Sequence, residues 1–218
     1  MSLVLASNSP RRKQLLALGG WVFRVEPALV DENPLPGEDC LGYVLRLAQS
    51  KAQAIAEHSP LGDIIIAADT TVVDGSQILG KPVDALEAES MLRQLRGRQH
   101  QVYTALAVVR RSDNFMIMDW CVTDVPMRAY SDEEMRAYIA TGDPLDKAGA
   151  YAIQHPDFKP VDGLQGCFAN VMGLPLCHLV RTLARLGINA DRDIPQACQK
   201  ELQYSCSFFP LVIGRSEI

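Results

Sequence analysis

Three cations stand together near the start of the chain, where a helix is predicted to begin: Arg11, Arg12 and Lys13. Ser9 suits the N-cap and Pro10 the first helical position, so we expect the helix to begin at Pro10. A helix N-terminus carries partial positive charge, so these cations repel one another and the helix dipole. A bound phosphate would remove this conflict, because backbone N–H groups and cations would then converge on it. The alternative is a solvated basic turn, and the residues of this stretch favour neither interpretation.

A phosphate site in this turn makes two predictions about stability. Pyrophosphate should raise the melting temperature, because a ligand that binds only the native state stabilises it. Replacing Arg11 and Arg12 by glutamine should blunt that response and leave the unliganded protein as stable as before, or slightly more stable, because the repulsion at the helix end is then relieved.

A single carboxylate interrupts the apolar run of residues 63–73, which is typical of a strand covered on both faces. This residue is Asp69. A buried carboxylate is costly unless it is paired, hydrogen-bonded or bound to metal, and perturbed carboxylates cluster at functional sites. We therefore favour a functional role for Asp69 over a structural one. Its residue type suits either a general base or a metal ligand, and the sequence leaves both open.

Other charged residues flank the predicted strands and helices. Asp31 and Glu32 are adjacent carboxylates in the loop before a predicted helix at 39–57, which carries Lys51. Helical spacing alone favours a solvated surface position for Lys51, because buried lysines are rare. Lys81 lies between Gly80 and Pro82 at the end of a short strand, where we expect a fixed cation.

Composition narrows the function classes. The chain has 218 residues, 48% hydrophobic residues and a net charge of −5, which is typical of a globular protein and argues against a nucleic-acid-binding domain. Its six cysteines show no zinc-site spacing, so we expect reduced thiols in the cytoplasm. Whether Cys198 and Cys206 pair stays open. No apolar run approaches the length of a membrane span, and we expect no targeting segment.

Helices and strands alternate along the first hundred residues, which predicts an α/β fold, and a long antiparallel pair follows. Capping residues and turns set the boundaries of these elements. The predicted strands are 3–6, 21–25, 63–73, 77–79, 101–111 and 115–128, and the predicted helices are 10–18, 39–57, 84–96, 131–142 and 175–186, the last of the chain. We expect one domain over residues 1–187 and a tail of unknown role over 188–218, which has no clear period.

Motifs in this order and spacing resemble the Maf family of nucleoside triphosphate pyrophosphatases. The match is collinear over about residues 3 to 186. It is carried by Leu5-Ala6-Ser7-Asn8-Ser9-Pro10-Arg11-Arg12, Val30-Asp31-Glu32, Leu47-Ala48-Gln49-Ser50-Lys51-Ala52, Ala68-Asp69-Thr70, Gly80-Lys81-Pro82, His100-Gln101-Val102-Tyr103-Thr104, Asp146-Lys147-Ala148-Gly149-Ala150-Tyr151-Ala152-Ile153-Gln154 and Val171-Met172-Gly173-Leu174-Pro175-Leu176.

The resemblance implies hydrolysis of nucleoside triphosphates to the monophosphate and pyrophosphate with a divalent cation, Mg²⁺, Mn²⁺ or Co²⁺. It implies a single Maf/inosine-triphosphatase-like α/β domain, in which helices flank a mixed central β-sheet with an active-site cleft. The family's catalytic aspartate aligns with Asp69, which with Glu32 would hold the metal. Its substrate-binding residues align with Ser9, Arg11, Arg12, Lys51, Thr70, Lys81 and Gln154.

Positions matching Arg11, Thr70 and Gln154 distinguish two branches of the family. The residues here resemble the branch that prefers dTTP and UTP, whereas the 7-methyl-GTP branch carries an aromatic residue, Gln and Glu. The donor and acceptor atoms of Gln154 suit the edge of uracil or thymine. The resemblance also leaves open a homodimer, and a nucleotide-binding regulator of septum formation or cell division in which hydrolysis is secondary.

Overall fold

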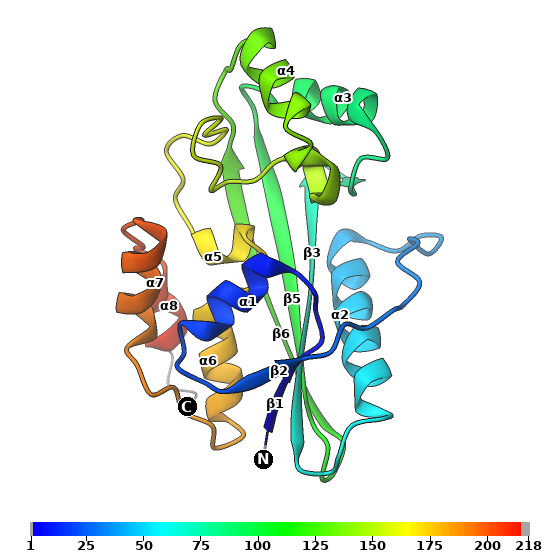
Figure 1. The fold of residues 1–218 in the computed structure, drawn as a ribbon, viewed down its shortest axis with the longest axis vertical. Helices are drawn as coiled ribbons and strands as arrows, with labels where there is room; N and C mark the ends of the chain where they lie inside the picture. Colours follow the sequence, from blue (N-terminus) through cyan, green and yellow to red (C-terminus); the bar gives the residue numbers. More distant parts are fainter. Residues whose placement is uncertain (1, 215–218) are drawn as a thin grey trace.

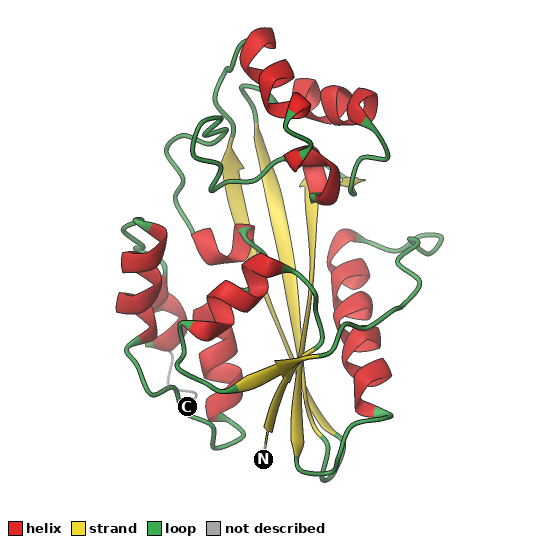
Figure 2. Ribbon diagram, viewed as in Figure 1, coloured by secondary structure: helices red, strands yellow, loops and turns green. Residues whose placement is uncertain are grey.

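Six strands form one mixed β-sheet at the centre of the computed structural model, which describes residues 2–214 (Figures 1 and 2). The strand order is β2-β1-β3-β5-β6, and β4 pairs with β3. β1 runs parallel to β2 and β3, and the other pairs are antiparallel. The strands are β1 (Ser2–Leu5), β2 (Phe23–Val25), β3 (Asp63–Asp74), β4 (Gln77–Leu79), β5 (Gln99–Arg110) and β6 (Phe115–Pro126).

Helices cover both faces of this sheet, with α2 on one face and α1, α5 and α6 on the other (Figure 1). The helices are α1 (Pro10–Ala17), α2 (Cys40–Ala56), α3 (Ala85–Leu95), α4 (Asp132–Ala140), α5 (Phe168–Val171), α6 (Leu176–Ala184), α7 (Ile194–Leu202) and α8 (Phe209–Ile213), with 3-10 turns η1 (Asp143–Asp146) and η2 (Ala148–Ala150). The predicted fold class, a mixed central sheet flanked by helices, is confirmed.

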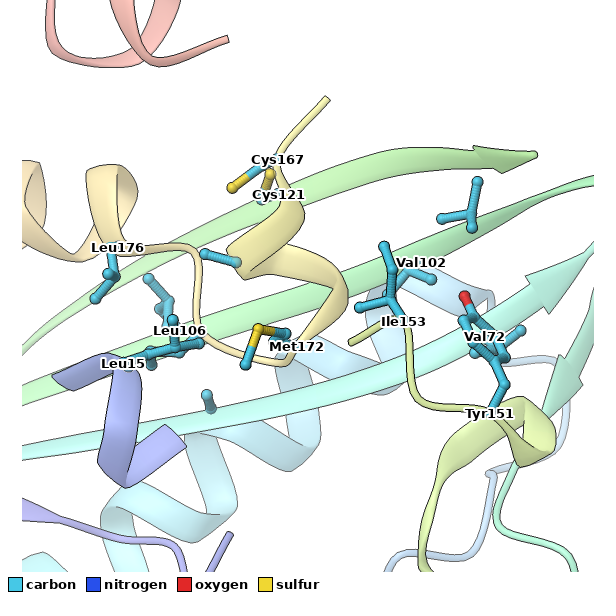
Figure 3. Packing of buried hydrophobic residues seen from close by; sticks show 14 of the residues in the cluster. Leu15, Val72, Val102, Leu106, Cys121, Tyr151, Ile153, Cys167, Met172 and Leu176 are labelled. Atoms are coloured by element: carbon cyan, nitrogen blue, oxygen red, sulfur yellow. The ribbon is translucent and has the colours of Figure 1, made fainter. Parts of the chain in front are cut away.

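Alternate residues of β3 enter two separate hydrophobic cores, because successive side chains of a strand point to opposite faces. Ile64, Ile66, Ala68 and Val72 belong to the larger core, with Leu15 of α1 and residues of α3 and α6. Figure 3 shows part of this core, where Leu15, Leu106 and Met172 lie together. Ile65 and Ala67 belong to the smaller core under α2. Residue 69 therefore faces α2, and residue 70 faces α1.

One edge of β3 is interrupted halfway along the strand. β1 pairs with residues 63–66, and β4 pairs with residues 72–74. Between them, residues 67–71 have no strand partner on that edge among the described residues, although β5 pairs with them on the other. The sheet therefore has a gap along residues 67–71 of β3, with Asp69 and Thr70 near its middle. We call this unpaired edge the sheet gap.

Most predicted boundaries are confirmed within one or two residues, because capping chemistry fixes them. Ser9 accepts a hydrogen bond from the Arg12 N–H, and Ser131 forms a capping box with Glu134. The strand expected at 21–25 begins two residues later, at Phe23. One prediction is wrong: the helix of residues 175–186 is not the last of the chain.

Two further helices follow Gly187, in the segment predicted to be a tail. Ile188 and Ile194 are buried in the larger core, and Cys198, Leu202 and Phe208 pack against it. Asp193 caps α7, a start signal that the prediction overlooked, whereas α8 has only five residues and little periodicity to detect. Residues 215–218 of the predicted tail lie outside the described residues. The boundary at residue 187 stays a prediction.

Four thiols line one cavity of about 20 Å³ between α5, α6 and the segment after Gly187: Cys167, Cys177, Cys198 and Cys206. All six cysteines are free, so Cys198 and Cys206 do not pair in this structure. Cys167 also lies beside Cys121 of β6 (Figure 3). Within residues 2–214, the helices are all too short or too polar to cross a membrane.

Candidate active site

Asp69 lies at the sheet gap and forms an ion pair with Lys51. The Lys51 Nζ is 2.6 Å from Asp69 Oδ1 and 2.5 Å from Glu32 Oε1. Asp69 is 6% exposed and Lys51 is 8% exposed, whereas Glu32 is exposed on its loop. The expectation of a solvated Lys51 is therefore wrong. α2 packs its apolar face on the sheet and thereby brings Lys51 over Asp69.

Tyr43 and Arg46 of α2 hold the loop that carries Glu32. The Tyr43 hydroxyl donates to the Glu32 carbonyl at 2.9 Å, and Arg46 Nη2 donates to the carbonyl of Asn33 at 3.1 Å. Burial, with the nearby Asp69 and Glu32 charges, raises the pKa of Tyr43 to about 12, so this donor keeps its proton at neutral pH. This role of Tyr43 was not predicted, because a tyrosine on a helix is usually a packing residue.

Arg12 turns away from its helix end and into the protein. Its Nε donates to the Gly173 carbonyl at 2.9 Å, Nη1 to Ser7 Oγ at 3.2 Å, and Nη2 to Thr70 Oγ1 at 3.1 Å. Lys13 instead donates to Asn8 Oδ1 at 3.1 Å. The expected convergence of all three cations on one point is therefore wrong: Arg12 faces the sheet gap, and Lys13 folds back on its own turn.

Gly173 allows this close approach of Arg12 and Thr70. Its φ of +102° lies in a region that side chains disfavour, and a Cβ there would lie 3.2 Å from Thr70 Oγ1 and 3.4 Å from Arg12 Nε. Neither Gly173 nor Ser7 was among the predicted site residues. Both lie within the matched motifs, but their residue types carry no sign of chemistry.

Electrostatic interactions connect these groups across the gap. Burial raises the pKa of Asp69, and the charges of Lys51 and Arg12 oppose this shift. Burial also raises the pKa of Glu32, but Lys51, Lys81 and Arg12 together lower it below the ordinary value. Burial lowers the pKa of Arg12, and Arg11 adds to this effect while Asp69 opposes it. Lys81 and Arg11 are therefore close enough to act on the site by their charge.

The remaining predicted site residues lie around these groups. Ser9 caps α1, Lys81 is exposed after β4, and Gly80 beside it accepts a hydrogen bond from Gly149 N at 3.0 Å. Gln154 is exposed after η2, and its side chain makes no hydrogen bond to the described residues. The structure thus forms two groups of contacts at the sheet gap, Lys51 with Glu32 and Asp69, and Arg12 with Thr70. It leaves the Gln154 side chain without a hydrogen bond to the described residues.

Two carboxylates suit a hard cation at this site. Asp69 and Glu32 each contact Lys51 through one oxygen, and the second oxygen of each has no side-chain partner among the described residues. Within residues 2–214, no three His, Cys, Asp or Glu side chains form a metal site. Mg²⁺ is commonly held by one or two carboxylates together with substrate phosphates. The donor set therefore fits a cation that arrives with its substrate.

Comparison with known proteins agrees with the motifs. The model of the Maf family, described as Maf-like protein, matches residues 2–186. The dTTP/UTP pyrophosphatase of Thermomicrobium roseum is 47% identical over 92% of this chain and 93% of its own length. The Myxococcus xanthus protein of the same name is 48% identical over 85% and 93%, and that of Geobacter sp. is 46% identical over 85% and 96%.

Similarity to solved structures is more distant. A dITP/XTP pyrophosphatase from Mycobacterium abscessus is 15% identical over 85% of this chain and 98% of that chain, with a TM-score of 0.41. The family model and the three curated relatives cover most of the sequence. This chain belongs to the Maf family.

Proposed function

We propose that the chain hydrolyses nucleoside triphosphates, with dTTP and UTP preferred, to the monophosphate and pyrophosphate. The main support for this proposal is the buried carboxylate of Asp69, which forms an ion pair with Lys51 and interacts electrostatically with Arg12. A protein that only bound nucleotide would need the cations but no buried carboxylate among them. The names of the curated relatives support the same reaction.

The cations of the site would neutralise the triphosphate. Water must attack a phosphorus surrounded by negative oxygens, and pyrophosphate must leave, so fixed positive groups lower the barrier. Three of the five guanidinium N–H groups of Arg12 donate hydrogen bonds within the protein, and the other two could bind phosphate oxygens. Lys51 contributes a buried positive charge. Arg11, Lys81 and the N-terminus of α1 complete a positive rim around the sheet gap.

Asp69 and Glu32 would hold a divalent cation, which supplies further charge stabilisation and activates water when bound. In the proposed reaction Asp69 orients the attacking water and accepts its proton. Burial favours this role, because it raises the pKa of Asp69 and makes the carboxylate a stronger base than an ordinary aspartate. Lys51 limits the shift and fixes the carboxylate by one oxygen, so the other stays free for water or metal.

Gln154 would recognise the base. Its amide has both a donor and acceptors, which match the alternating edge of uracil or thymine. A site that hydrogen-bonds one base edge discriminates strongly against bases that leave its polar groups unpaired. Because Gln154 is exposed, its replacement changes recognition without removing a contact that stabilises the fold.

The test is pyrophosphate release from dTTP, UTP, ATP, GTP and 7-methyl-GTP with Mg²⁺, Mn²⁺ or Co²⁺. We expect the highest kcat/KM for dTTP and UTP. Gln154→Leu should reduce this preference, whereas Gln53→Leu, at an exposed glutamine of α2, should not. Equal kcat/KM for 7-methyl-GTP and UTP would contradict the specificity. Tight nucleotide binding without any turnover would support the regulator instead.

A further inference from the structure

Thr104 lies in the middle of β5, fully buried and directly opposite Thr70 in the β3–β5 register. Its hydroxyl oxygen is 3.0 Å from Thr70 Oγ1, and it donates to the carbonyl of Asn170 at 3.0 Å. A threonine hydroxyl carries one hydrogen, and a carbonyl only accepts. The hydrogen of Thr104 is therefore committed to Asn170.

This commitment sets the direction of every bond as far as Arg12. Thr104 has no second hydrogen, so Thr70 must donate to it. The Thr70 oxygen then accepts from Arg12 Nη2 at 3.1 Å, and Thr70 has no hydrogen left to donate to a ligand. The order is Arg12 to Thr70 to Thr104 to Asn170, and we call it the hydroxyl chain.

The far end of the hydroxyl chain is anchored firmly. Asn170 Nδ2 donates to the Val102 carbonyl at 3.0 Å and to Thr123 Oγ1 at 2.9 Å, which ties α5 to both β5 and β6. Asn170 is fully buried. The acceptor that fixes Thr104 is therefore held by the core of the sheet and does not depend on an exposed loop.

At the other end of the hydroxyl chain, the bond to Thr70 helps to determine which N–H groups of Arg12 are available to a ligand. A guanidinium has five N–H donors in one plane, and Arg12 uses three of them on Gly173, Ser7 and Thr70. One N–H on each terminal nitrogen is left over among the described contacts. Arginine binds phosphate best when two such donors are held in a fixed plane.

We propose that Thr104 is a positioning residue for Arg12, which it holds in place through Thr70. The inference deepens the proposed function, because the two free N–H groups of Arg12 would bind the phosphates of the triphosphate. Phosphates are common to all nucleotides. Loss of the Thr104 hydroxyl should therefore weaken every triphosphate by the same factor.

The decisive variant is Thr104→Val, which keeps the shape of the side chain and removes its hydroxyl. We expect kcat/KM to fall about tenfold, the size of one lost hydrogen bond to a charged network, and the ratio of UTP to ATP to stay unchanged. The inhibition constant of inorganic pyrophosphate should rise by the same factor. Thr104→Ser retains the hydroxyl and should restore values near wild type.

Thr182→Val is the matched control, because Thr182 is also buried and its hydroxyl donates to a carbonyl, that of His178 at 2.9 Å in α6. It should lower stability as much as Thr104→Val without changing pyrophosphate binding. The inference is overturned if Thr104→Val binds pyrophosphate like wild type, if Thr104→Ser fails equally, or if the ratio of UTP to ATP changes. Calorimetric binding of pyrophosphate tests the inference even if wild type proves to hydrolyse no triphosphate, and should Thr104→Val fail to fold, Thr70→Val tests the same chain.

Discussion

Lys51 and Asp69 form a buried ion pair with 2.6 Å between Nζ and Oδ1. The two residues come from different elements, α2 and β3, and each is less than a tenth exposed. Glu32 shares the same ammonium group at 2.5 Å. Lys51 therefore keeps a counter-charge when Asp69 is neutralised, whereas Asp69 loses its directly bonded cation when Lys51 is replaced. Removing one partner of a buried ion pair typically lowers the free energy of unfolding by about 3–5 kcal/mol. Lys51→Met should therefore lower the stability of the fold more than neutralising Asp69 does.

Asp69→Asn should fold normally and lose turnover by a factor of at least about a hundred, because the amide cannot act as a base or bind a cation well. Circular dichroism checks the fold, and pyrophosphate release checks the activity. Asp63→Asn is the matched control: Asp63 is a buried carboxylate of the same strand, paired with Arg24 at 2.6 Å, and lies at its far end. Equal losses in the two variants would refute the assignment of Asp69.

The pH dependence of kcat/KM should show the raised pKa of Asp69. The base must be deprotonated, so activity rises with pH, and burial places the midpoint above the ordinary aspartate value of about 3.9. The charge of Lys51 lowers this pKa, so Lys51→Met should move the midpoint to higher pH in whatever activity it keeps. A pH–rate profile of both proteins measures the shift. A midpoint that moves to lower pH in the variant would contradict the role of Lys51.

Arg11 and Arg12 should differ in their effect on stability. Arg12→Gln loses three hydrogen bonds to Ser7, Thr70 and Gly173 and should lower the free energy of unfolding by about 1–3 kcal/mol. The sequence-based prediction of unchanged or greater stability is therefore revised for Arg12 and retained for Arg11. In both variants pyrophosphate should raise the melting temperature less than it does in wild type. In all three proteins this rise should be smaller at high salt, which screens exposed charges. If pyrophosphate raised the melting temperature of Arg11→Gln as much as that of wild type, the charge of Arg11 would not act on the ligand.

Reactivity of the cavity thiols should report opening of the segment after Gly187. Burial raises the pKa of Cys177 and of Cys198 to about 12, and alkylation requires the thiolate, so both should react slowly with iodoacetamide. Ile194→Ala removes a buried anchor of α7 and should speed the labelling of Cys177 without reducing turnover. Mass spectrometry of timed samples follows each cysteine. Cys40, which is half-buried outside this cavity, serves as the internal control, and parallel acceleration of Cys40 would indicate global unfolding.

Local chemistry made much of the fold predictable. Ser9, Asp39, Asp84 and Ser131 all cap helices at the expected places. Asp69 was identified because a carboxylate in an apolar strand conflicts with its surroundings. α8 was missed because it has only five residues. α7 was missed although it is as long as α6 and Asp193 caps it, and both helices pack on α6.

The contacts of the site were less accessible to sequence reasoning. Lys51 has the spacing of a surface lysine, and only the packing of α2 on the sheet reveals its burial. Thr104 and Gly173 act on groups 34 and more residues away in the chain, through a register and a backbone carbonyl that no local pattern contains. Use of a divalent metal, cytoplasmic location and a homodimer stay predictions.

The sheet gap has a consequence for the backbone itself. Ile66 O accepts from Ala6 N, and the peptide groups of alternate residues point to the same edge, so those of Ala68 and Thr70 point into the gap. A phosphate oxygen or water in the gap would be offered amide hydrogens that a neighbouring strand would otherwise bind. The substrate would then take the place of a missing strand segment. Its arrival would be visible as slowed hydrogen exchange at these two amides in the middle of β3.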